Sequence, residues 1–284
     1  MSYPVLPKCV LKSVLPAEIN TVEVEQLKSE IETLSAASQY GWGHTINFGP
    51  FGKEGLLKDS YLNIAGGYDL FKWWPARLDG MVVADVGCFT GGMALLMAER
   101  GAATIYAVDE IPEHIEQCAL LARTFDRPEI KPVLKSVFRL EEEIPRGSLD
   151  LIVLSGVLYH LSDMLVGLYS LRQLLKPGGV LLLESNGVDD FSCSYANFGR
   201  FYGGMWWQPT GRCIIDMCQF MGFEQCEVNF YLPDRCLARA TRSEHDITFR
   251  RGLNWPFSSL RDLTVRGLDP RAMAPAPVLP SGNP

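Results

Sequence analysis

The stretch VVADVGCFTGGMALLMAERGA, from Val82 to Ala102, decides the fold. Its first five residues are apolar except for Asp85, which suits a buried strand, and they lead into a turn with glycines at 87, 91 and 92. A helix-forming run follows the turn. In a doubly wound sheet such a turn lies beyond the carboxyl end of a strand, where ligands bind. The stretch therefore predicts a strand–turn–helix unit that holds a nucleotide-like ligand.

The residues around this turn discriminate between two classes of ligand. The dinucleotide fingerprint G-x-G-x-x-G seats a pyrophosphate, and the spacing of Gly87, Phe89 and Gly91 misses it. Asp85 precedes the turn, and a carboxylate there repels a pyrophosphate but attracts an ammonium or sulfonium group. Asp109 closes the next predicted strand, where a carboxylate can accept both hydroxyls of a ribose. S-adenosylmethionine is therefore favoured over a dinucleotide, and a turn without a ligand stays open as the alternative.

Composition limits the classes of function. The chain has 284 residues, of which 47% are hydrophobic, so it can build one large domain with a real core. The formal net charge of −7 disfavours broad attraction to phosphate backbones. The eight cysteines form no CxxC pair and are expected to be buried, reduced thiols, and no metal site is predicted. Without a signal-like or membrane-length apolar run, we expect a cytoplasmic protein with no membrane contact.

Strand and helix patterns alternate from residue 81 onward. This alternation predicts βαβ units and an α/β fold with a doubly wound, mostly parallel, seven-stranded Rossmann-like sheet. The last two strands should form an antiparallel hairpin at the sheet edge. The expected strands are 81–86, 104–108, 130–136, 149–155, 180–185, 225–231 and 235–240. The expected helices are 92–100, 112–125, 162–175 and 210–221.

The chain divides into three predicted parts. Residues 1–78 should contain an amphipathic helix over 16–38 and an aromatic, glycine-rich lid with short helices. Residues 79–245 should form the ligand-binding domain. Residues 246–284, rich in proline and small residues, should be a partly flexible C-terminal extension.

Four motifs together resemble the class I S-adenosylmethionine-dependent methyltransferases. They are DVGCFTGG, AVD, SLDLIVLSGVLYHLSD and LRQLLKPGGVLLLES. More narrowly, GVLYH, WWQPTGRCIIDMCQFMGF and GHTINFGPFG are similar to the branch that includes the tRNA wobble-uridine carboxymethyltransferase and many small-molecule relatives. The resemblance covers about residues 40–240 and implies that S-adenosyl-L-methionine is the cofactor. It is specific for the superfamily and weak for the substrate.

The resemblance also implies which residues hold the cofactor. Gly87 and Gly91 approach the methionine part, and Asp109 binds the ribose. Asp85 and Phe89 belong to the same turn and are also expected to contact the cofactor. The remaining cofactor contacts implied are Glu110, Ile111, Ser136, Val137, Ser155 and Tyr159. Whether the cofactor is plain or carboxylated stays open. In the resemblance, Arg235 is the candidate counterpart of the arginine that holds the carboxylated form.

Two histidines and a tyrosine are the candidate catalytic residues for methyl transfer. Methyl transfer benefits from a base when the nucleophile is a hydroxyl or an acidic carbon. His160 follows the fourth strand on the binding edge and titrates near neutrality, although it could instead order its loop. His44, in GWGHTINFG, is a second candidate base or substrate contact, with a hydrogen-bonded loop histidine as the alternative. Tyr159 is expected to face the transferring methyl.

Two tryptophans are candidates for the substrate pocket, and two further histidines have no predicted role. Trp206 and Trp207 precede a predicted helix start in which Pro209 occupies the first turn, and one of them should wall the substrate pocket unless both pack in the core. His114 and His245 are expected on the surface.

Three functions remain open. The leading hypothesis is a methyltransferase that acts on a small molecule, such as a natural-product intermediate, most readily at oxygen and less so at nitrogen or carbon. The second is a tRNA wobble-uridine modifier, which the acidic balance and the lack of a basic run oppose. The third is a non-catalytic S-adenosylmethionine-binding protein, since fold and cofactor binding do not guarantee chemistry. The oligomeric state is undetermined.

Overall fold

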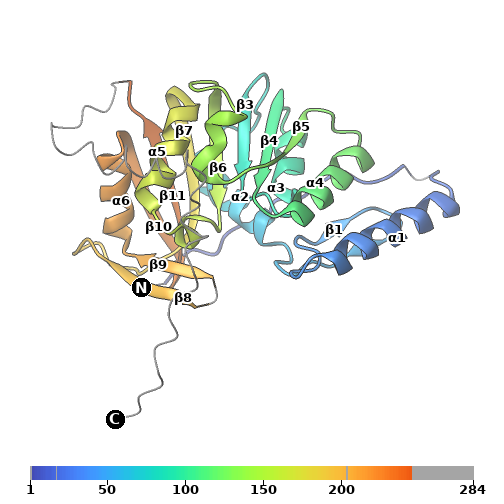
Figure 1. Cartoon of the computed structure of the whole chain (residues 1–284), viewed down its shortest axis with the longest axis horizontal. Coiled ribbons are helices and arrows are strands. Elements are labelled where there is room, and N and C mark those ends of the chain that lie inside the picture. The colour runs from blue at the N-terminus through green and yellow to red at the C-terminus, as the bar shows by residue number, and fades with distance from the viewer. Residues whose placement is uncertain (1, 17, 203, 245–284) are drawn as a thin grey trace, which may run out of the picture.

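A seven-stranded sheet forms the centre of the protein in a computed structural model that describes residues 2–16, 18–202 and 204–244 (Figure 1). The strands of this sheet are β3 (Val82–Val86), β4 (Thr104–Asp109), β5 (Ile130–Leu134), β6 (Leu149–Ser155), β7 (Leu175–Asn186), β10 (Phe223–Leu232) and β11 (Arg235–Arg242). Two small antiparallel pairs lie outside it, namely β1 (Ile46–Asn47) with β2 (Gly52–Lys53) and β8 (Ala196–Tyr202) with β9 (Met205–Pro209).

The order of the strands fixes where a ligand can bind. It is β10-β11-β7-β6-β3-β4-β5, with β3 to β7 parallel and β11 antiparallel to both of its neighbours. The chain runs outward from β3 to β5 and then returns to β6 on the other side of β3, so the order reverses between β3 and β6. The turns after these two strands border the crevice that doubly wound folds use for ligands. The predicted fold class and its edge hairpin, β10–β11, are confirmed.

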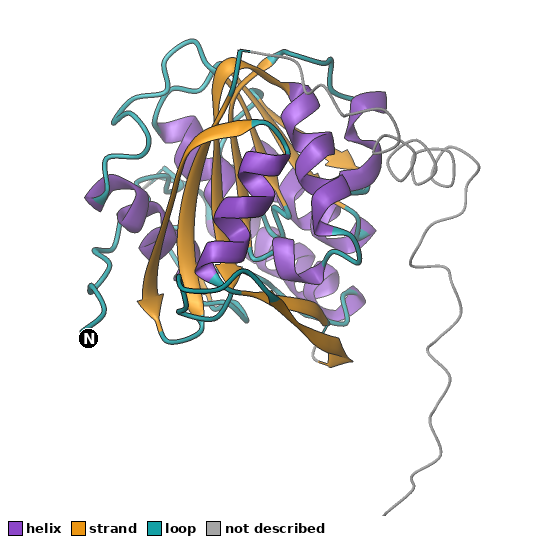
Figure 2. Ribbon diagram, turned by 90° about the vertical axis from the view of Figure 1, so that its left-hand side faces the viewer, coloured by secondary structure: helices purple, strands orange, loops and turns teal. Residues whose placement is uncertain are grey.

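Helices cover both faces of the sheet (Figure 2). The helices are α1 (Thr21–Ala37), α2 (Ser60–Leu70), α3 (Gly92–Glu99), α4 (Pro112–Thr124), α5 (Met164–Leu174) and α6 (Gly211–Phe220), with short turns of 3-10 helix at η1 (Val137–Glu142) and η2 (Leu158–His160). One buried cluster joins α2, α3 and α4 to the first face, and another joins α5 and α6 to the second. Burial on both faces explains why strands such as β6 are almost continuously apolar.

Side-chain caps explain where several helices begin. Asn20 accepts from the N–H of Glu23 at 2.9 Å, Asp163 from Val166 at 3.0 Å, and Thr210 from Cys213 at 3.0 Å. These bonds satisfy backbone donors that the first helical turn leaves free. As a result α5 and α6 start inside the expected ranges, because Ser162 and Thr210 lie before the helical residues.

The stretch before α6 differs from the prediction. Gln208 and Pro209 do not start a helix, because they pair with Asn197 and Ala196 in the β8–β9 hairpin. The strand β7 also begins five residues earlier than the expected 180, since Leu175 pairs with Leu149.

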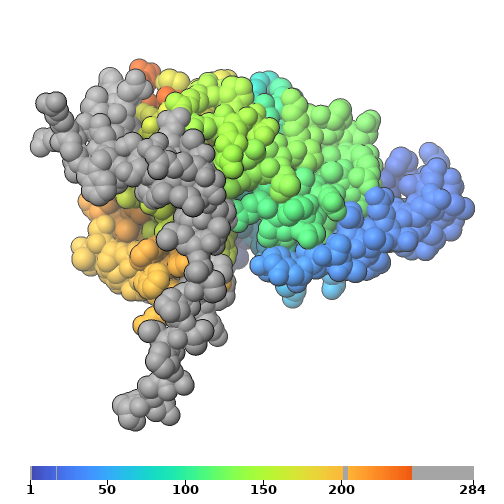
Figure 3. All heavy atoms as spheres, in the orientation of Figure 1, coloured from blue at the N-terminus to red at the C-terminus, as the bar shows by residue number. Residues whose placement is uncertain are grey.

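The N-terminal segment packs closely against the part of the chain that carries the seven-stranded sheet. Leu15 donates its N–H to the carbonyl of Phe48, and Ser13 donates its hydroxyl to Glu99 on α3 at 2.6 Å. Figure 3 shows this segment, in blue, against the green surface that contains α4. The predicted lid at 40–80 contains the 11-residue helix α2, most of which is buried.

Two predictions fall outside the described residues, namely the flexible extension at 246–284 and the surface position of His245. Among the helices that the structure describes, none is both long enough and apolar enough to span a bilayer. Within the same residues the eight cysteines are free thiols, four of them buried, and no three metal-binding side chains gather.

Candidate functional site

Two glycines shape the turn after β3. Gly87 has φ +79°, and a Cβ added there would lie 2.2 Å from Cγ2 of Val157, in the loop after β6. Gly91 has φ +86°, and its added Cβ would lie 2.7 Å from Sγ of Cys118 on α4. Both positions combine a left-handed backbone with close packing, which only glycine tolerates without strain. The turns after β3 and β6 therefore touch at the point where the strand order reverses.

Asp85 is a buried carboxyl group directly before this turn. Only 2% of the residue is exposed, and its Oδ2 has no hydrogen-bond partner among the described residues. Burial raises its pKa to about 7, and the nearby charge of Asp109 adds to the increase. A buried acceptor without a partner is costly unless a donor arrives. The ammonium group of a methionine moiety is a donor of the required charge, so this residue fits the predicted cofactor.

Asp109 is already oriented by the backbone. Its Oδ2 accepts the N–H of Phe89 at 3.1 Å, and its Oδ1 accepts the N–H of Ile111 at 3.1 Å. Its side chain is 10% exposed. A carboxylate oxygen accepts more than one hydrogen bond, so both oxygens keep capacity for ribose hydroxyls.

Phe89 packs this turn against residues 40–55, which cover the turn. We call these residues the cap segment. Its backbone is left-handed, with φ +50°. The ring fills the space beside Gly43, where an added Cβ would lie 1.7 Å from Cδ1 of Phe89. The ring centroid is 5.8 Å from that of His44 and 4.1 Å from that of His114, edge to face in both cases. A bulky residue in this turn thus holds the cap segment in place.

His44 lies over the N-terminus of α3. The backbone N–H of His44 donates to Oγ1 of Thr90 at 2.8 Å. The ring nitrogen Nδ1 accepts the backbone N–H of Gly92 at 3.2 Å. Because Nδ1 is an acceptor, a neutral ring carries its proton on Nε2. Burial lowers the pKa to about 4, and the neighbouring His114 lowers it further against the opposing effect of Asp109. This environment suits a hydrogen-bond donor better than a base.

His160 and Tyr159 lie in η2, directly after β6. The two rings are 4.1 Å apart between centroids. Nδ1 of His160 lies 2.7 Å from the carbonyl oxygen of Gly204, in the turn between β8 and β9. A carbonyl can only accept, so Nδ1 carries the proton and Nε2 keeps its lone pair. Burial lowers the pKa of His160 and the charge of Arg235 lowers it further, while the bond to Gly204 opposes them.

A buried ion pair supports Tyr159. Arg235 donates from Nε and Nη2 to Glu184 at 2.7 and 2.6 Å, and from Nη1 to Oη of Tyr159 at 3.2 Å. Glu184 is fully buried and also accepts the hydroxyl of Tyr231 at 2.8 Å. The guanidinium charge of Arg235 is therefore balanced inside the protein.

The β8–β9 hairpin, whose strand β9 contains Trp206 and Trp207, lies against η2. Figure 1 shows this hairpin below the sheet. Trp207 donates its indole N–H to the carbonyl of Ser162 at 3.0 Å, which joins the hairpin to the loop after His160. Phe198 is 55% exposed, and its ring lies 6.2 Å from that of Trp206 and 5.1 Å from that of Trp207 between centroids. The hairpin therefore offers an aromatic surface next to His160.

The other predicted cofactor contacts lie at the same edge. The carbonyl of Ser155 would lie 3.7 Å from a Cβ on Gly87, which puts the end of β6 beside the turn. Ser136 and Val137 follow β5, and Val137 is buried. Glu110 is exposed after β4. The structure thus brings together the residues of the turn after β3, Asp109 and the loop after β6. Trp206 and Trp207 lie on a separate hairpin.

His114 was expected on the surface, and this prediction is wrong. The residue is 3% exposed, and its Nδ1 lies 3.2 Å from Oδ1 of Asp109. The sequence did contain a signal, because residue 114 falls in the first turn of the helix that follows Asp109. Helical side chains tilt toward the helix N-terminus, which here faces the end of β4.

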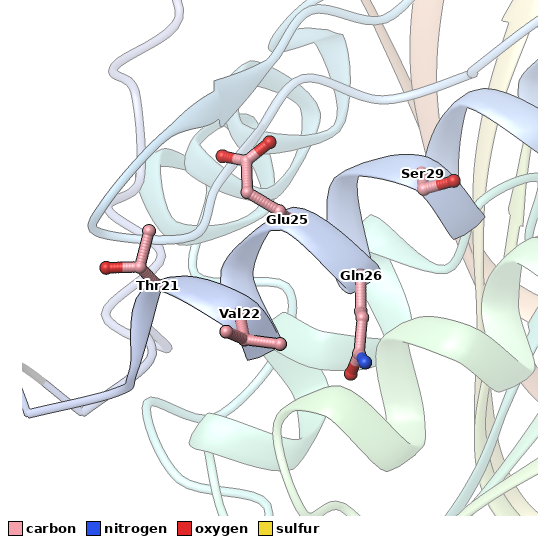
Figure 4. A pocket seen from close by; sticks show the side chains of 5 residues that line it. All are labelled: Thr21, Val22, Glu25, Gln26 and Ser29. Carbon is pink, nitrogen blue, oxygen red and sulfur yellow. The ribbon is translucent and has the colours of Figure 1, made fainter.

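A surface hollow on α1 is not part of this site (Figure 4). It is lined by Thr21, Val22, Glu25, Gln26 and Ser29, all from one helix. Figure 4 shows Glu25 and Gln26 pointing to opposite sides of the helix, so the hollow gathers no convergent groups.

The fold and the site define a class of protein. The sheet has seven strands with an antiparallel edge hairpin. A glycine turn follows an acidic residue, and a carboxylate closes the next strand. These are the features of Rossmann-like enzymes that bind a nucleoside. Residues 67–225 match a family profile described as a methyltransferase domain, Methyltransf_23. The chain belongs to this family, the class I S-adenosylmethionine-dependent methyltransferases, as the sequence motifs predicted.

Curated relatives narrow the resemblance. The chain is 29% identical over 181 residues to the tRNA U34 carboxymethyltransferase of Desulfotalea psychrophila, a match that covers 62% of this chain and 55% of the relative. It is 30% identical over 186 residues to the protein of that name from Helicobacter pylori, covering 63% and 70%. The chain thus matches between about half and seven-tenths of these relatives' lengths. Their names correspond to the alternative function, the tRNA modifier, and not to a small-molecule enzyme.

Solved structures support the fold. The cyclase SpnF has a TM-score of 0.55 at 15% identity, over 82% of this chain and 99% of that one. Phosphoethanolamine N-methyltransferase 2 from Haemonchus contortus, in complex with S-adenosyl-L-methionine, has a TM-score of 0.53 at 16% identity, over 67% and 53%. One fold thus serves different chemistries, and the substrate has to be argued from the site.

Proposed function

We propose that this enzyme transfers a methyl group from S-adenosylmethionine to a base of tRNA, with uridine 34 as the first candidate. The names of the curated relatives support this acceptor. The single structural observation that carries the proposal is the pairing of a base-competent histidine, His160, with an exposed aromatic hairpin at the edge where the strand order reverses.

The donor would lie along the carboxyl edge of the sheet. Asp109 would accept the ribose hydroxyls, since its carboxylate is fixed by two backbone N–H groups. Asp85 would accept a hydrogen bond from the ammonium group, which its partnerless Oδ2 favours. Gly87 would let the turn pack against Val157 and keep its left-handed conformation beside the donor. When bound, S-adenosylmethionine supplies a methyl group that its sulfonium makes electrophilic.

His160 would take the proton that the acceptor loses. Its Nδ1 donates to Gly204, so the Nε2 lone pair remains for an O–H or N–H of the nucleophile. Arg235 and Glu184 would keep Tyr159 beside it, because they hold the hydroxyl of that tyrosine. His44, as a neutral donor, would contribute orientation and not proton removal.

The β8–β9 hairpin would hold the acceptor. Phe198 and Trp206 lie nearly parallel, with 25° between the ring planes, and Phe198 is largely exposed. Aromatic side chains of this kind stack on unpaired bases, at about 1–3 kcal/mol per base. An anticodon base is unpaired and can be turned out of its stack.

A plain methyl group fits the site better than a carboxymethyl group. A carboxymethyl group carries a negative charge, which calls for a cation in the site. Arg235 is the candidate counterpart of the arginine that holds the carboxylated form, and its charge is balanced by the buried Glu184. We therefore propose methylation and not the carboxymethyl transfer that the relatives are named for.

Methylation of a small molecule, most readily at oxygen, is the second candidate. The net charge of −7 favours it, because binding to tRNA depends on cations that displace counterions. Several basic residues are also engaged in ion pairs, such as Arg100 with Asp69. The same donor site and the same base would serve either acceptor.

One experiment separates the two acceptors. The purified full-length protein is incubated with S-adenosylmethionine carrying a heavy methyl group, together with bulk tRNA or with a small-molecule extract. Nucleoside digests and extracts are then analysed by mass spectrometry. A labelled uridine derivative that maps to position 34 supports the tRNA acceptor, and label only in a small molecule overturns it in favour of the second candidate. The variant Asp109→Ala, which should not bind the donor, serves as the control.

A further inference from the structure

His114 is a buried histidine whose ring nitrogens make no hydrogen bond among the described residues. It lies in the first turn of α4, and its side chain is only 4% exposed. Its Nδ1 lies 3.2 Å from Oδ1 of Asp109, but the ring is not aligned for a hydrogen bond. Both ring nitrogens are therefore buried without a hydrogen-bond partner among the described residues. A buried polar atom left unpaired costs about 1–3 kcal/mol, so this arrangement needs an explanation.

The surroundings keep the ring in this position. Phe89 contacts it edge to face, with 4.1 Å between centroids, and Tyr40 lies 5.8 Å away. Both neighbours come from segments that border the predicted donor site, namely the turn after β3 and the cap segment. The carboxylate of Asp109, which the donor's sugar would use, lies 3.2 Å from Nδ1 of the ring. A small rotation of the ring would direct an Nδ1–H at Oδ1 of Asp109.

We propose that His114 is a positioning residue for the donor: its imidazole donates to the Asp109 carboxylate and holds that carboxylate toward the ribose hydroxyls. The backbone N–H of Phe89 holds Oδ2 of the carboxylate and that of Ile111 holds Oδ1, and His114 adds a second donor to Oδ1. The hydrogen bond from His114 forms as the sugar binds, and it orients the Asp109 carboxylate toward the ribose hydroxyls. This inference rests on the donor position in the function proposed above, but not on the identity of the acceptor.

Binding of S-adenosylhomocysteine, measured by calorimetry, tests the inference without catalysis. His114→Phe keeps a ring against Phe89 and removes both nitrogens, and it should weaken binding on the order of 10-fold. His114→Asn carries an amide nitrogen at the same number of bonds from Cα as Nδ1, so it should bind within about 3-fold of the wild type. Rescue by asparagine is the result that a purely structural role would not give.

Leu120 provides the matched control. It is buried on the same helix, in the cluster that packs α4 against the sheet. Leu120→Ala should lower the thermal stability and leave the affinity for S-adenosylhomocysteine unchanged. An equal loss of affinity in this variant, or in both His114 variants, would mean that packing of α4 is responsible and would overturn the inference.

Asp109→Ala separates failure of this inference from failure of the donor site. If Asp109→Ala abolishes binding while His114→Phe binds normally, the donor site stands and the role of His114 is refuted. If Asp109→Ala binds normally, the donor site itself is wrong. Imidazole nitrogen NMR of the wild type gives a readout that needs no variant. S-adenosylhomocysteine should shift the His114 Nδ1 resonance toward a hydrogen-bonded donor, and an unchanged resonance contradicts the proposal.

Discussion

Nδ1 of His160 lies 2.7 Å from the carbonyl oxygen of Gly204, which couples the loop after β6 to the turn of the β8–β9 hairpin. This contact fixes the tautomer of the ring, because the carbonyl can only accept. It also links the candidate base to the aromatic surface that would hold the acceptor. The contact therefore connects proton removal to acceptor binding.

The first prediction concerns His160 itself. His160→Asn keeps an amide N–H close to the position of Nδ1 but has no counterpart of the Nε2 lone pair. Turnover should fall about 100-fold, while affinity for S-adenosylhomocysteine stays the same, as expected for a general base. Single-turnover kinetics and calorimetry measure the two effects. As a control, Trp207→Phe loosens the hairpin by removing the bond to Ser162, and it should reduce turnover much less. Equal rates for His160→Asn and the wild type would leave His160 with only a loop-ordering role.

The second prediction concerns the pH dependence of stability through Asp85. Its folded pKa of about 7 lies above the unfolded value, so its stabilising contribution is present below about pH 4 and is lost as the pH rises toward 7. Asparagine cannot ionise but has the shape of the protonated carboxyl. Asp85→Asn should therefore match the wild type near pH 4 and exceed its free energy of unfolding at pH 8 by roughly 4 kcal/mol.

Urea denaturation at the two pH values measures this difference, and the other titrating groups cancel between variant and wild type. The same substitution should weaken binding of S-adenosylhomocysteine, because it removes the charge that meets the ammonium. A variant that is less stable than the wild type by the same amount at both pH values would show that the carboxyl is not the titrating group.

The third prediction concerns the contact between the two turns. Gly87→Ala adds a Cβ at 2.2 Å from Cγ2 of Val157 and forces alanine into φ +79°. The free energy of unfolding should fall by roughly 2–4 kcal/mol, the sum of backbone strain and overpacking. Gly178→Ala isolates the strain, because φ is +77° and no atom lies within 4 Å of the added Cβ. Equal effects for the two variants would mean that the turns do not pack as described.

The fourth prediction concerns the buried ion pair. Glu184→Gln leaves Arg235 partly buried without a counter-charge and should destabilise the protein by roughly 2–4 kcal/mol. Replacing both residues, as Glu184→Gln with Arg235→Met, should recover most of this loss. The exposed pair Arg77–Asp79 is the control, and Asp79→Asn should change stability by less than about 1 kcal/mol. Failure of the double variant to recover would argue that Glu184 acts through its other partner, Tyr231.

Much of the fold could be predicted because its signals are local. The order of strands and helices from Val82 onward, the glycine turn and the acidic strand ends are all written in short stretches of sequence. The β8–β9 hairpin could not be predicted. Its glycines interrupt the alternation of side chains, and its register is irregular between Phe198 and Tyr202.

The surroundings of Phe89 depend on distant residues. From the sequence Phe89 is only a departure from a glycine-rich turn, but in the structure its ring occupies the space left open by Gly43. These two positions are 46 residues apart, so no local pattern relates them. The burial of His114 depends partly on distant residues, since the side chains that enclose it come from the turn and from the cap segment, and only its place at the start of α4 is visible in the sequence.

The central claim is that the donor nucleoside lies across the carboxyl edge of β3 and β4. A crystal structure of the protein with S-adenosylhomocysteine tests it most directly. The account predicts density for the ribose within hydrogen-bond distance of Asp109 and for the ammonium beside Asp85. A complex with the ligand bound away from both carboxylates, or the crevice closed by side chains at saturating ligand, would contradict it.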